Sequence, residues 1–536
     1  MVFELDKSSL IHVVESEKEK FLFHKGEGFA CDSLPVGSRV IYGPPPLPPV
    51  PHPREAIRQA LLHPLGCEPL PDLLKPGMKI SIAIDDLSLP LPPMLTPDIR
   101  QLILEEVLEV LGGGGVTDIH LIMAVALHRH MTPKEIRRTV GANVFNRFFP
   151  DRLYNHDAED WDNITELGRT DEGEIVDINS RAAESDLIIY VNICLTAMDG
   201  GHKSLHTGMA TYKSIRSHHT PMVLEESSLM DPLGGSPFHD SLRRMGKILH
   251  EHLNVFTVET TVNSNTFPTF QNGLHFGFLK KAERDYSAFD RVNFAVQRES
   301  LRLMPMALRR AIFQSIRAPY GLTSVYAGRT EPVHQEILTN IYRQQEVPVK
   351  GQCDVEIIGV PYIGPYNVYS IMNPLLLHCL ALGYLYNMYR RKPLVKEGGV
   401  MILFHHLREE FHPVHHPSYI DFYNQVLTET TDFVEIHEKY EEEFATNPRY
   451  IQLYRKQYAY HGVHAPYMWY WGCRGMQHLG KVIVVSPDST RAAERIGYDH
   501  AANLREAIEM STSFLGRTPS ISYFHLPPIF VCSVED

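Results

Sequence analysis

A glycine-rich loop carries a lysine with imidazoles on both sides. It runs from Asp199 to Gly208 (DGGHKSLHTG), and the adjacent pair His218 and His219 follows it. Glycines let a backbone approach a ligand closely and adopt positive φ. The lysine, Lys203, can contact an anion or, when desolvated, act as a covalent nucleophile, and imidazole is the commonest metal ligand. The loop therefore predicts a site for a phosphorylated, covalently tethered, metal-bearing cofactor.

Other polar groups also follow the ends of predicted strands. Three apolar, β-rich segments have the character of buried strands: 79–84, 118–125 and 186–191. Asp85 and Asp86 follow the first, His128 follows the second, and the glycine-rich loop follows the third. Ligands gather at the carboxyl ends of parallel strands, so these groups predict one shared site. The alternative is that they are ordinary turn-forming or capping residues.

Helical patterns separate the strands. Over 96–111, Thr96 can cap a helix and Pro97 suits its first position. Thr132 and Glu135 form a capping box for the next helix. Continuous apolar strands that alternate with helices are typical of a mostly parallel sheet.

A second α/β unit is predicted from about Asp354 onward. It has strand patterns at 354–361, 395–404 and 481–485, and helical patterns at 367–392 and 493–509. We therefore expect an α/β protein of two domains with mostly parallel sheets and a cofactor cleft between them. Their predicted bounds are 1–345, including an N-terminal extension over 1–75, and 346–536.

Composition excludes several classes of protein. The chain has 536 residues, 43% of them hydrophobic and 21% charged, with a net charge of −13, which argues against an extended nucleic-acid surface. It contains no run of 18 apolar residues that would predict a membrane span, and its N-terminus lacks the pattern of a signal peptide. The seven scattered cysteines form no CxxC motif, so we expect reduced thiols and a cytoplasmic location.

Short motifs follow one another in order over roughly residues 75–515. They are Asp85-Asp86-Leu87-Ser88-Leu89-Pro90, Leu127-His128-Arg129, MTPKE (131–135), NHD (155–157), LGRT (167–170), GEIV (173–176), ESDL (184–187), the glycine-rich loop, VYAG (325–328) and VKEGG (395–399). In this order and spacing they resemble the nickel-dependent lactate racemase family, whose members use a nickel-pincer nucleotide.

The resemblance implies a cofactor and the residues that hold it. The cofactor is pyridinium-3-thioamide-5-thiocarboxylic acid mononucleotide carrying Ni(II). Lys203 corresponds to the lysine that forms the thioamide link. His219, sixteen residues later, corresponds to the histidine that completes the square-planar nickel, with His218 as the alternative. Soft sulfur and imidazole ligands suit Ni(II) in this geometry.

The resemblance also implies an isomerase that acts on a 2-hydroxy acid or a related hydroxyl substrate. Racemisation or epimerisation would proceed by reversible hydride transfer to the cofactor, while His128, one of the family's two acid/base histidines, moves a proton. We further expect cofactor contacts from Asp86, Ser88, Gly200, Gly201, His202, Lys203, Gly208 and Tyr369. Proteins of cofactor synthesis are the implied donors; no nucleic-acid or membrane partner is expected.

The chain departs from the family pattern at several positions. Ile193 stands where the second acid/base histidine would fall, and Leu89 replaces an arginine of the first turn. Ser370 and Asn373 replace the glutamine and lysine that anchor the substrate carboxylate, and Thr207 replaces a proline. Losing the arginine and the lysine removes charge that would bind a small carboxylate, which favours a less anionic or bulkier substrate.

Other interpretations remain open. His202 or His206 could take the place of the missing catalytic histidine. The chain could instead bind or store the nucleotide without catalysis, or be a histidine-ligated zinc hydrolase. The histidines of 405–416 are expected on a solvated loop, and the aromatic run 469–471 either packs between domains or covers the cofactor.

Overall fold

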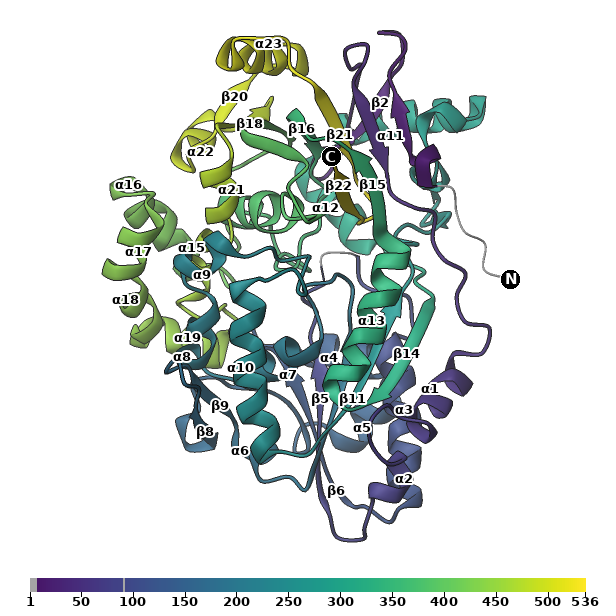
Figure 1. The fold of residues 1–536 in the computed structure, drawn as a ribbon, viewed down its shortest axis with the longest axis vertical. Helices are drawn as coiled ribbons and strands as arrows, with labels where there is room; N and C mark the ends of the chain where they lie inside the picture. The colour runs from purple at the N-terminus through teal and green to yellow at the C-terminus, as the bar shows by residue number, and fades with distance from the viewer. Residues whose placement is uncertain (1–6, 90–91) are drawn as a thin grey trace.

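Two parallel sheets organise the chain. The computed structural model describes residues 7–89 and 92–536, so Pro90, the last residue of the aspartate-rich motif, lies outside the described residues. In Figure 1 one sheet lies in the lower half and the other in the upper half, with helices around both. This arrangement confirms the predicted α/β class with mostly parallel sheets.

The first sheet has six strands in the order β14-β11-β10-β5-β6-β7. Their bounds are β5 (Lys79–Asp85), β6 (Asp118–Ala124), β7 (Leu153–Asn155), β10 (Leu187–Ile193), β11 (Val255–Val262) and β14 (Leu322–Gly328). All neighbours are parallel except β14, which runs antiparallel to β11. The carboxyl ends of β5, β6 and β10 therefore meet at one edge, as the sequence predicts.

Helices cover both faces of this sheet. They are α1 (Pro53–Leu62), α2 (Leu70–Leu73), α3 (Ile99–Gly113), α4 (Pro133–Val140), α5 (Ala142–Phe148), α6 (Ser180–Ala183), α7 (Gly201–Met209), α8 (Tyr212–Ile215), α9 (Pro221–Glu226), α10 (Pro237–His252) and α13 (Thr330–Gln345). Ile82 of β5 packs in a core with Ile103 of α3, whereas the next residue, Ala83, packs with Leu205 of α7 and Met245 of α10. Successive strand residues point to opposite faces, so both faces are apolar and buried.

The second sheet has seven strands in the order β1-β4-β21-β16-β18-β19-β20. They are β1 (Ile11–Val13), β4 (Arg39–Tyr42), β16 (Cys353–Gly359), β18 (Val395–Phe404), β19 (Lys481–Val485), β20 (Asp499–Ala501) and β21 (Ile521–His525). β4 pairs in parallel with β21, so the N-terminal extension joins the sheet of the C-terminal half. Figure 1 shows the purple N-terminal strands beside the C-terminal ones at the top.

The helices of the C-terminal half pack on this second sheet and toward the first. They are α14 (Pro374–His378), a π-helix over Cys379–Leu385, α15 (Pro417–Asp421), a π-helix over Phe422–Val426, α16 (Leu427–Glu429), α17 (Phe433–Lys439), α18 (Glu441–Thr446), α19 (Pro448–Gln457), α20 (His464–Tyr470), α21 (Cys473–His478), α22 (Thr490–Arg495) and α23 (Leu504–Leu515). Figure 1 shows α15 to α19 at the side of the molecule, spanning the two halves.

The remaining elements are short or peripheral. They are the hairpins β2 (Phe21–His24) with β3 (Phe29–Asp32), β8 (Ile164–Arg169) with β9 (Ile175–Asn179) and β12 (Phe270–Gln271) with β13 (Leu274–His275), the helices α11 (Ala288–Leu303) and α12 (Met306–Ser315), and a small sheet of β15 (Glu346–Lys350), β22 (Val531–Glu535) and β17 (Tyr389–Arg390). Within the described residues, no helix is long and apolar enough to cross a membrane.

Two predicted helices differ from the structure. The helix predicted from Thr96 begins at Ile99, because the carboxylate of Asp98 accepts a hydrogen bond from the Arg100 amide and caps it. The helix predicted over 493–509 is interrupted: Gly497 has φ of +77°, and β20 pairs with β19 before α23 begins.

The pattern over 367–392 is helical only in part. Residues up to Asn373 form an irregular loop, and helix begins at Pro374, where the Asn373 side chain accepts a hydrogen bond from the Leu376 amide. This loop carries Tyr369, Ser370 and Asn373 between the two sheets.

Candidate functional site

Asp86 and His128 form an ion pair at the carboxyl edge of the first sheet. Asp86 Oδ2 lies 2.8 Å from His128 Nδ1, and Ser88 Oγ lies 3.0 Å from the same carboxylate oxygen and 2.9 Å from the same imidazole nitrogen. Burial alone would raise the pKa of Asp86, but His128 and the hydrogen bonds from Ser88 outweigh it and lower that pKa. A carboxylate that binds Nδ1–H leaves Nε2 of His128 as the proton acceptor.

The neighbouring carboxyl group, Asp85, ties β5 to β10. It accepts hydrogen bonds from Tyr190 Oη at 2.8 Å and from the Ile193 amide at 3.0 Å. Burial raises the pKa of Asp85 to about 7, against these hydrogen bonds. Asp85 therefore fixes the strand edge from which Asp86 projects.

Lys203 lies in the first turn of α7, directly after the tight turn of the loop. Its Nζ donates to Asp199 Oδ1 at 3.1 Å, while Asp199 Oδ2 accepts from the Thr196 hydroxyl at 2.8 Å. The lysine side chain is mostly buried, with 17% of its surface exposed. The loop thus holds a primary amine in a fixed, largely desolvated position.

The glycines of the loop permit close packing. Gly200 has φ of +84°, and a Cβ there would lie 2.2 Å from Glu259 Oε1. A Cβ on Gly201 would lie 2.8 Å from the His334 ring, and one on Gly208 would lie 2.7 Å from the Ala124 side chain. The glycines therefore let the loop and α7 approach β11, α13 and β6. The cofactor contacts predicted for Gly200, Gly201 and Gly208 stay predictions.

His219 is a buried imidazole that directly follows the short 3-10 helix over Arg216–His218. Its Nδ1–H donates to the Ile215 carbonyl at 3.2 Å, which leaves the lone pair on Nε2. Burial, the Lys203 charge and, to a smaller extent, His128 lower the pKa of His219 to about 3, against that hydrogen bond. Its ring packs 5.2 Å from Tyr467 and 5.5 Å from Trp471, measured between ring centroids.

The other histidines around the loop point elsewhere. His218 is fully buried and contacts the Thr207 hydroxyl at 3.3 Å. His206 contacts Ser214 Oγ at 3.0 Å, and burial lowers its pKa to about 4. His202 packs against Gly246 and His250 of α10.

His202 also lines a separate cleft. This cleft has a volume of about 1210 Å³ and includes Leu187 and Val255, the first residues of β10 and β11. It therefore opens at the end of the sheet opposite Asp86 and His128. The structure brings His202 together with neither Lys203 nor His128.

Aromatic and imidazole side chains from the C-terminal half cover His128. The ring of His464 lies 5.3 Å from that of His128, and Tyr366 lies 5.1 Å from it. Nδ1 of His464 bonds to Tyr419 Oη at 2.6 Å, and its buried Nε2 has no hydrogen-bond partner within the described residues. Sequence reasoning missed His464, because only the packing of α20 against the first sheet reveals its position.

The segment that replaces the family's carboxylate anchors contacts buried histidines. Ser370 Oγ lies 2.9 Å from His415 Nδ1, and Asn373 Nδ2 lies 3.2 Å from His416 Nδ1. His416 is fully buried, and His405 is 4% exposed. The expectation of a solvated loop is therefore wrong for His405 and His416, which are buried, whereas His406, His412 and His415 are partly exposed.

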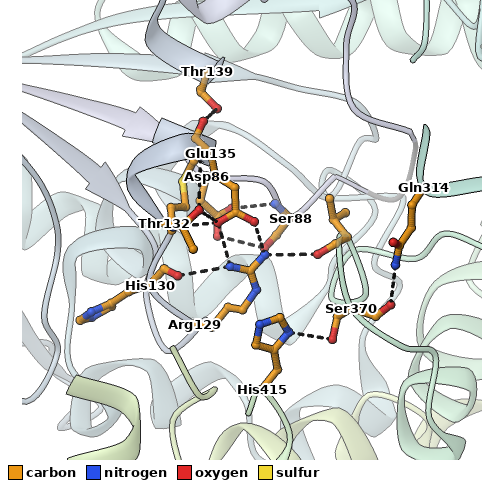
Figure 2. A network of polar contacts seen from close by, with 12 residues as sticks. Asp86, Ser88, Arg129, His130, Thr132, Glu135, Thr139, Gln314, Ser370 and His415 are labelled. Carbon is orange, nitrogen blue, oxygen red and sulfur yellow. Dashed lines mark hydrogen bonds and ion pairs between the residues drawn. The ribbon is translucent and has the colours of Figure 1, made fainter. Parts of the chain in front are cut away.

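Arg129 is the buried cation beside this segment. Its guanidinium forms a two-point ion pair with Glu135, at 2.7 and 3.0 Å, and donates to the Val368 carbonyl at 3.2 Å. Figure 2 shows Arg129 at the centre of this network, with Ser370 and His415 nearby. Because its donors are engaged by Glu135 and Val368, Arg129 serves to join the halves.

The remaining positions of interest lie outside this cluster or on its rim. Tyr369 has φ of +55°, and the Arg317 guanidinium lies 5.6 Å above its ring. Leu89 packs at the edge of the main core, and Ile193, at the end of β10, is 1% exposed. The apolar side chain of Ile193 provides no acid/base group at this edge.

Comparison with known proteins shows a likeness over the N-terminal part of the chain. Residues 33–231 match the family model of the lactate racemase N-terminal domain. The chain is 26% identical over 196 residues to a lactate racemase of Lactiplantibacillus plantarum, and 24% identical over 169 residues to one of Thermoanaerobacterium thermosaccharolyticum. These matches cover 36% and 31% of this chain, and only 43% and 38% of the two relatives.

The fold agrees over a longer span. The lactate racemase apoprotein of T. thermosaccharolyticum aligns with a TM-score of 0.61 and 16% identity, covering 97% of this chain and 100% of that one. At this identity the structural likeness shows a shared α/β fold. The N-terminal part of the chain, over residues 33–231, is similar to the lactate racemase N-terminal domain.

Proposed function

We propose that the protein is a nickel-pincer-dependent racemase or epimerase that acts on a 2-hydroxy acid or a related hydroxyl substrate. The observation that carries the proposal is one aromatic wall over both imidazoles: Tyr366 packs on His128 and Trp471 packs on His219, while Tyr384 packs on both Tyr366 and Trp471. After burial, the charge of Lys203 is the largest cause that lowers the pKa of His219.

The donor set supports the proposed cofactor. Lys203 presents its amine in the first turn of a helix, and His219 carries a lone pair on Nε2 because its other nitrogen donates to Ile215. Imidazole is a suitable ligand for Ni(II), and Lys203 would be the point of covalent attachment. Asp86, Ser88, Gly200, Gly201, Gly208 and Tyr369 remain proposed as further contacts, and proteins of cofactor synthesis as donors.

The chain's own residues would handle the proton. When bound, the nickel-pincer nucleotide supplies a reversible acceptor for the α-hydrogen of the substrate. His128 would take the hydroxyl proton on Nε2, and Asp86 would stabilise the resulting imidazolium through Nδ1–H. The aromatic side chains around His219 and His128 would exclude water.

His464 is the proposed second acid/base group in place of the histidine absent at Ile193. It lies next to His128, its Nδ1 is held by Tyr419, and its Nε2 has no hydrogen-bond partner within the described residues. His206 also has one buried nitrogen, Nδ1, without a hydrogen-bond partner within the described residues, while its Nε2 contacts Ser214. His464 is better placed because its ring contacts that of His128, and His202 lines the other cleft.

The substrate is proposed to have a lower ratio of negative charge to size than lactate has. Ser370 and Asn373, with His415 and His416, offer neutral hydrogen-bonding groups where the family places a lysine and a glutamine. Burial, Arg129 and His412 lower the pKa of His415 to about 3, so its imidazole is neutral at pH 7. Such a surface suits hydroxyl groups, as in a sugar acid.

The experiment is co-expression with cofactor-synthesis enzymes, followed by intact-mass and metal analysis and by incubation with single isomers of 2-hydroxy acids and sugar acids that carry deuterium at the α-carbon. We expect a mass adduct on Lys203, one nickel, and conversion of one substrate class to its other isomer with the α-deuterium retained, because a hydride does not exchange with solvent. Cofactor and nickel without interconversion or ketone formation from any substrate would instead support the second candidate, a binding or storage protein. The missing histidine at Ile193 is the observation that favours that candidate.

A further inference from the structure

A second set of metal-ligating side chains lies behind the glycine-rich loop. Cys194 follows β10, Glu259 lies in β11, and His334 lies on α13. One ligand atom from each, a thiol sulfur, a carboxylate oxygen and an imidazole nitrogen, lies within 4.8 Å of the other two. None of the three is used by the proposed reaction.

The three side chains are held by the loop itself. His334 Nδ1 lies 2.8 Å from Glu259 Oε1, and the Gly201 amide donates to Glu259 Oε2 at 3.1 Å. The Cys194 thiol donates to the Asp199 carbonyl at 2.9 Å. The cluster therefore contacts the same turn that carries Lys203.

Burial makes a cation favourable at this position. Glu259 is 0% exposed and Cys194 is 1% exposed. A buried carboxylate is costly unless a positive charge compensates it. The glycines of the turn seal the cluster, because a Cβ on Gly200 would overlap Glu259 Oε1.

We propose that Cys194, Glu259 and His334 bind one Zn²⁺ ion, or a cation of the same preference. Zinc takes sulfur, nitrogen and carboxylate oxygen ligands in tetrahedral sites, and three protein ligands leave a fourth position for water. His334, with 20% of its side chain exposed, marks the side from which water enters. Mg²⁺ and Ca²⁺ prefer all-oxygen sites and do not suit a thiol.

The ion would replace two protons and fasten the loop. It takes the place of the proton between Glu259 and His334 and of the thiol proton of Cys194. It would tie the end of β10 to β11 and α13, and so fix the turn from which Lys203 projects. This site is distinct from the proposed nickel position at His219, and the inference does not depend on the proposed function.

Co²⁺ titration of the full chain, stripped with a chelator and free of nucleotide cofactor, tests the proposal. We expect one equivalent of Co²⁺ to produce a thiolate-to-cobalt charge-transfer band that Zn²⁺ abolishes, with a rise in the melting temperature. Cys194→Ser should remove the band, whereas Cys473→Ser, a buried thiol beside α9, should keep it. The band identifies a sulfur ligand, so binding by the many histidines of the chain does not imitate it.

His334→Gln serves as a second variant, because His334 is partly exposed and its loss is less disruptive to folding. It should weaken Co²⁺ binding at least tenfold. Absence of a charge-transfer band in the wild-type protein, or a band unchanged in Cys194→Ser, would overturn the proposal. Neither outcome bears on adduct formation at Lys203. The zinc proposal and the proposed function can therefore be rejected independently of each other.

Discussion

Asp86 Oδ2 and His128 Nδ1 lie 2.8 Å apart, although the two residues are separated by 42 positions in the chain. The contact exists because β5 and β6 are parallel neighbours whose carboxyl ends meet. It gives His128 a defined tautomer with Nε2 as the acceptor. The first prediction concerns this pair.

Asp86→Asn should lower turnover of the cofactor-loaded protein by about 10²- to 10⁴-fold, the usual contribution of a positioned acid/base group. The reason is that an amide does not stabilise the imidazolium of His128. Steady-state kinetics of isomer interconversion, on the substrate that the panel identifies, would measure it. Asp171→Asn, at an exposed carboxylate, is the control; equal loss in both variants would contradict a role for Asp86.

Lys203→Arg should abolish the covalent adduct, because a guanidinium does not form the thioamide link. Intact-mass spectrometry after co-expression with the synthesis enzymes would detect the difference. Lys213→Arg is the control: the Lys213 ammonium lies over the Trp161 ring, and this variant should retain the adduct. An adduct that persists in Lys203→Arg would place the attachment elsewhere.

His219→Gln should lose nickel while keeping the nucleotide adduct, since it removes the Nε2 lone pair and leaves Lys203 in place. His218→Gln should keep nickel, because His218 contacts Thr207 and packs against Phe238. The metal-to-adduct ratio, from elemental and mass analysis of the same sample, separates the two. The reverse pattern would assign the ligand to His218.

His464→Gln should slow single-turnover oxidation of one enantiomer or epimer to the ketone, measured by chemical quench, by about 10²-fold or more and affect the other less, as expected for one of two acid/base groups. His478→Gln, whose ring bonds to the Val395 carbonyl, is a matched histidine control. Equal rates from both isomers in the His464 variant would exclude it as the second group.

Glu356→Gln should stabilise the protein at alkaline pH. Burial raises the pKa of Glu356 to about 8, and its Oε2 has no hydrogen-bond partner in the described chain. The folded state therefore holds a proton that the unfolded state releases above its ordinary pKa, so stability falls as pH rises toward 8.

The substitution should flatten this pH dependence. Relative to the wild type, it should raise the free energy of unfolding by roughly 2 kcal/mol more at pH 8 than at pH 5. Urea unfolding at the two pH values measures it. The control is Glu442→Gln, in an exposed side chain of α18. A wild-type protein that is equally stable at both pH values would contradict the assignment.

The sequence by itself determined several strands of the first sheet and the edge at which polar groups follow them. The apolar run 79–84 predicts a buried strand, which the structure confirms, and the residues that follow it lie at its carboxyl end. The capping box at Thr132 is a local pattern too, and the structure confirms it. The predicted glycine-rich loop is correct only as far as the turn at Gly200, because Gly201–Met209 form helix α7.

The tertiary structure decided which distant groups meet. Nothing local in residues 405–416 or 464 indicates that they pack over the first sheet, and no spacing relates Cys194 to Glu259 and His334. Likewise, the tertiary structure places His202 at the cleft on the opposite edge of the sheet and buries His219 against Tyr467 and Trp471. Such contacts depend on how helices and sheets dock, which is set by burial over the whole chain rather than by neighbouring residues.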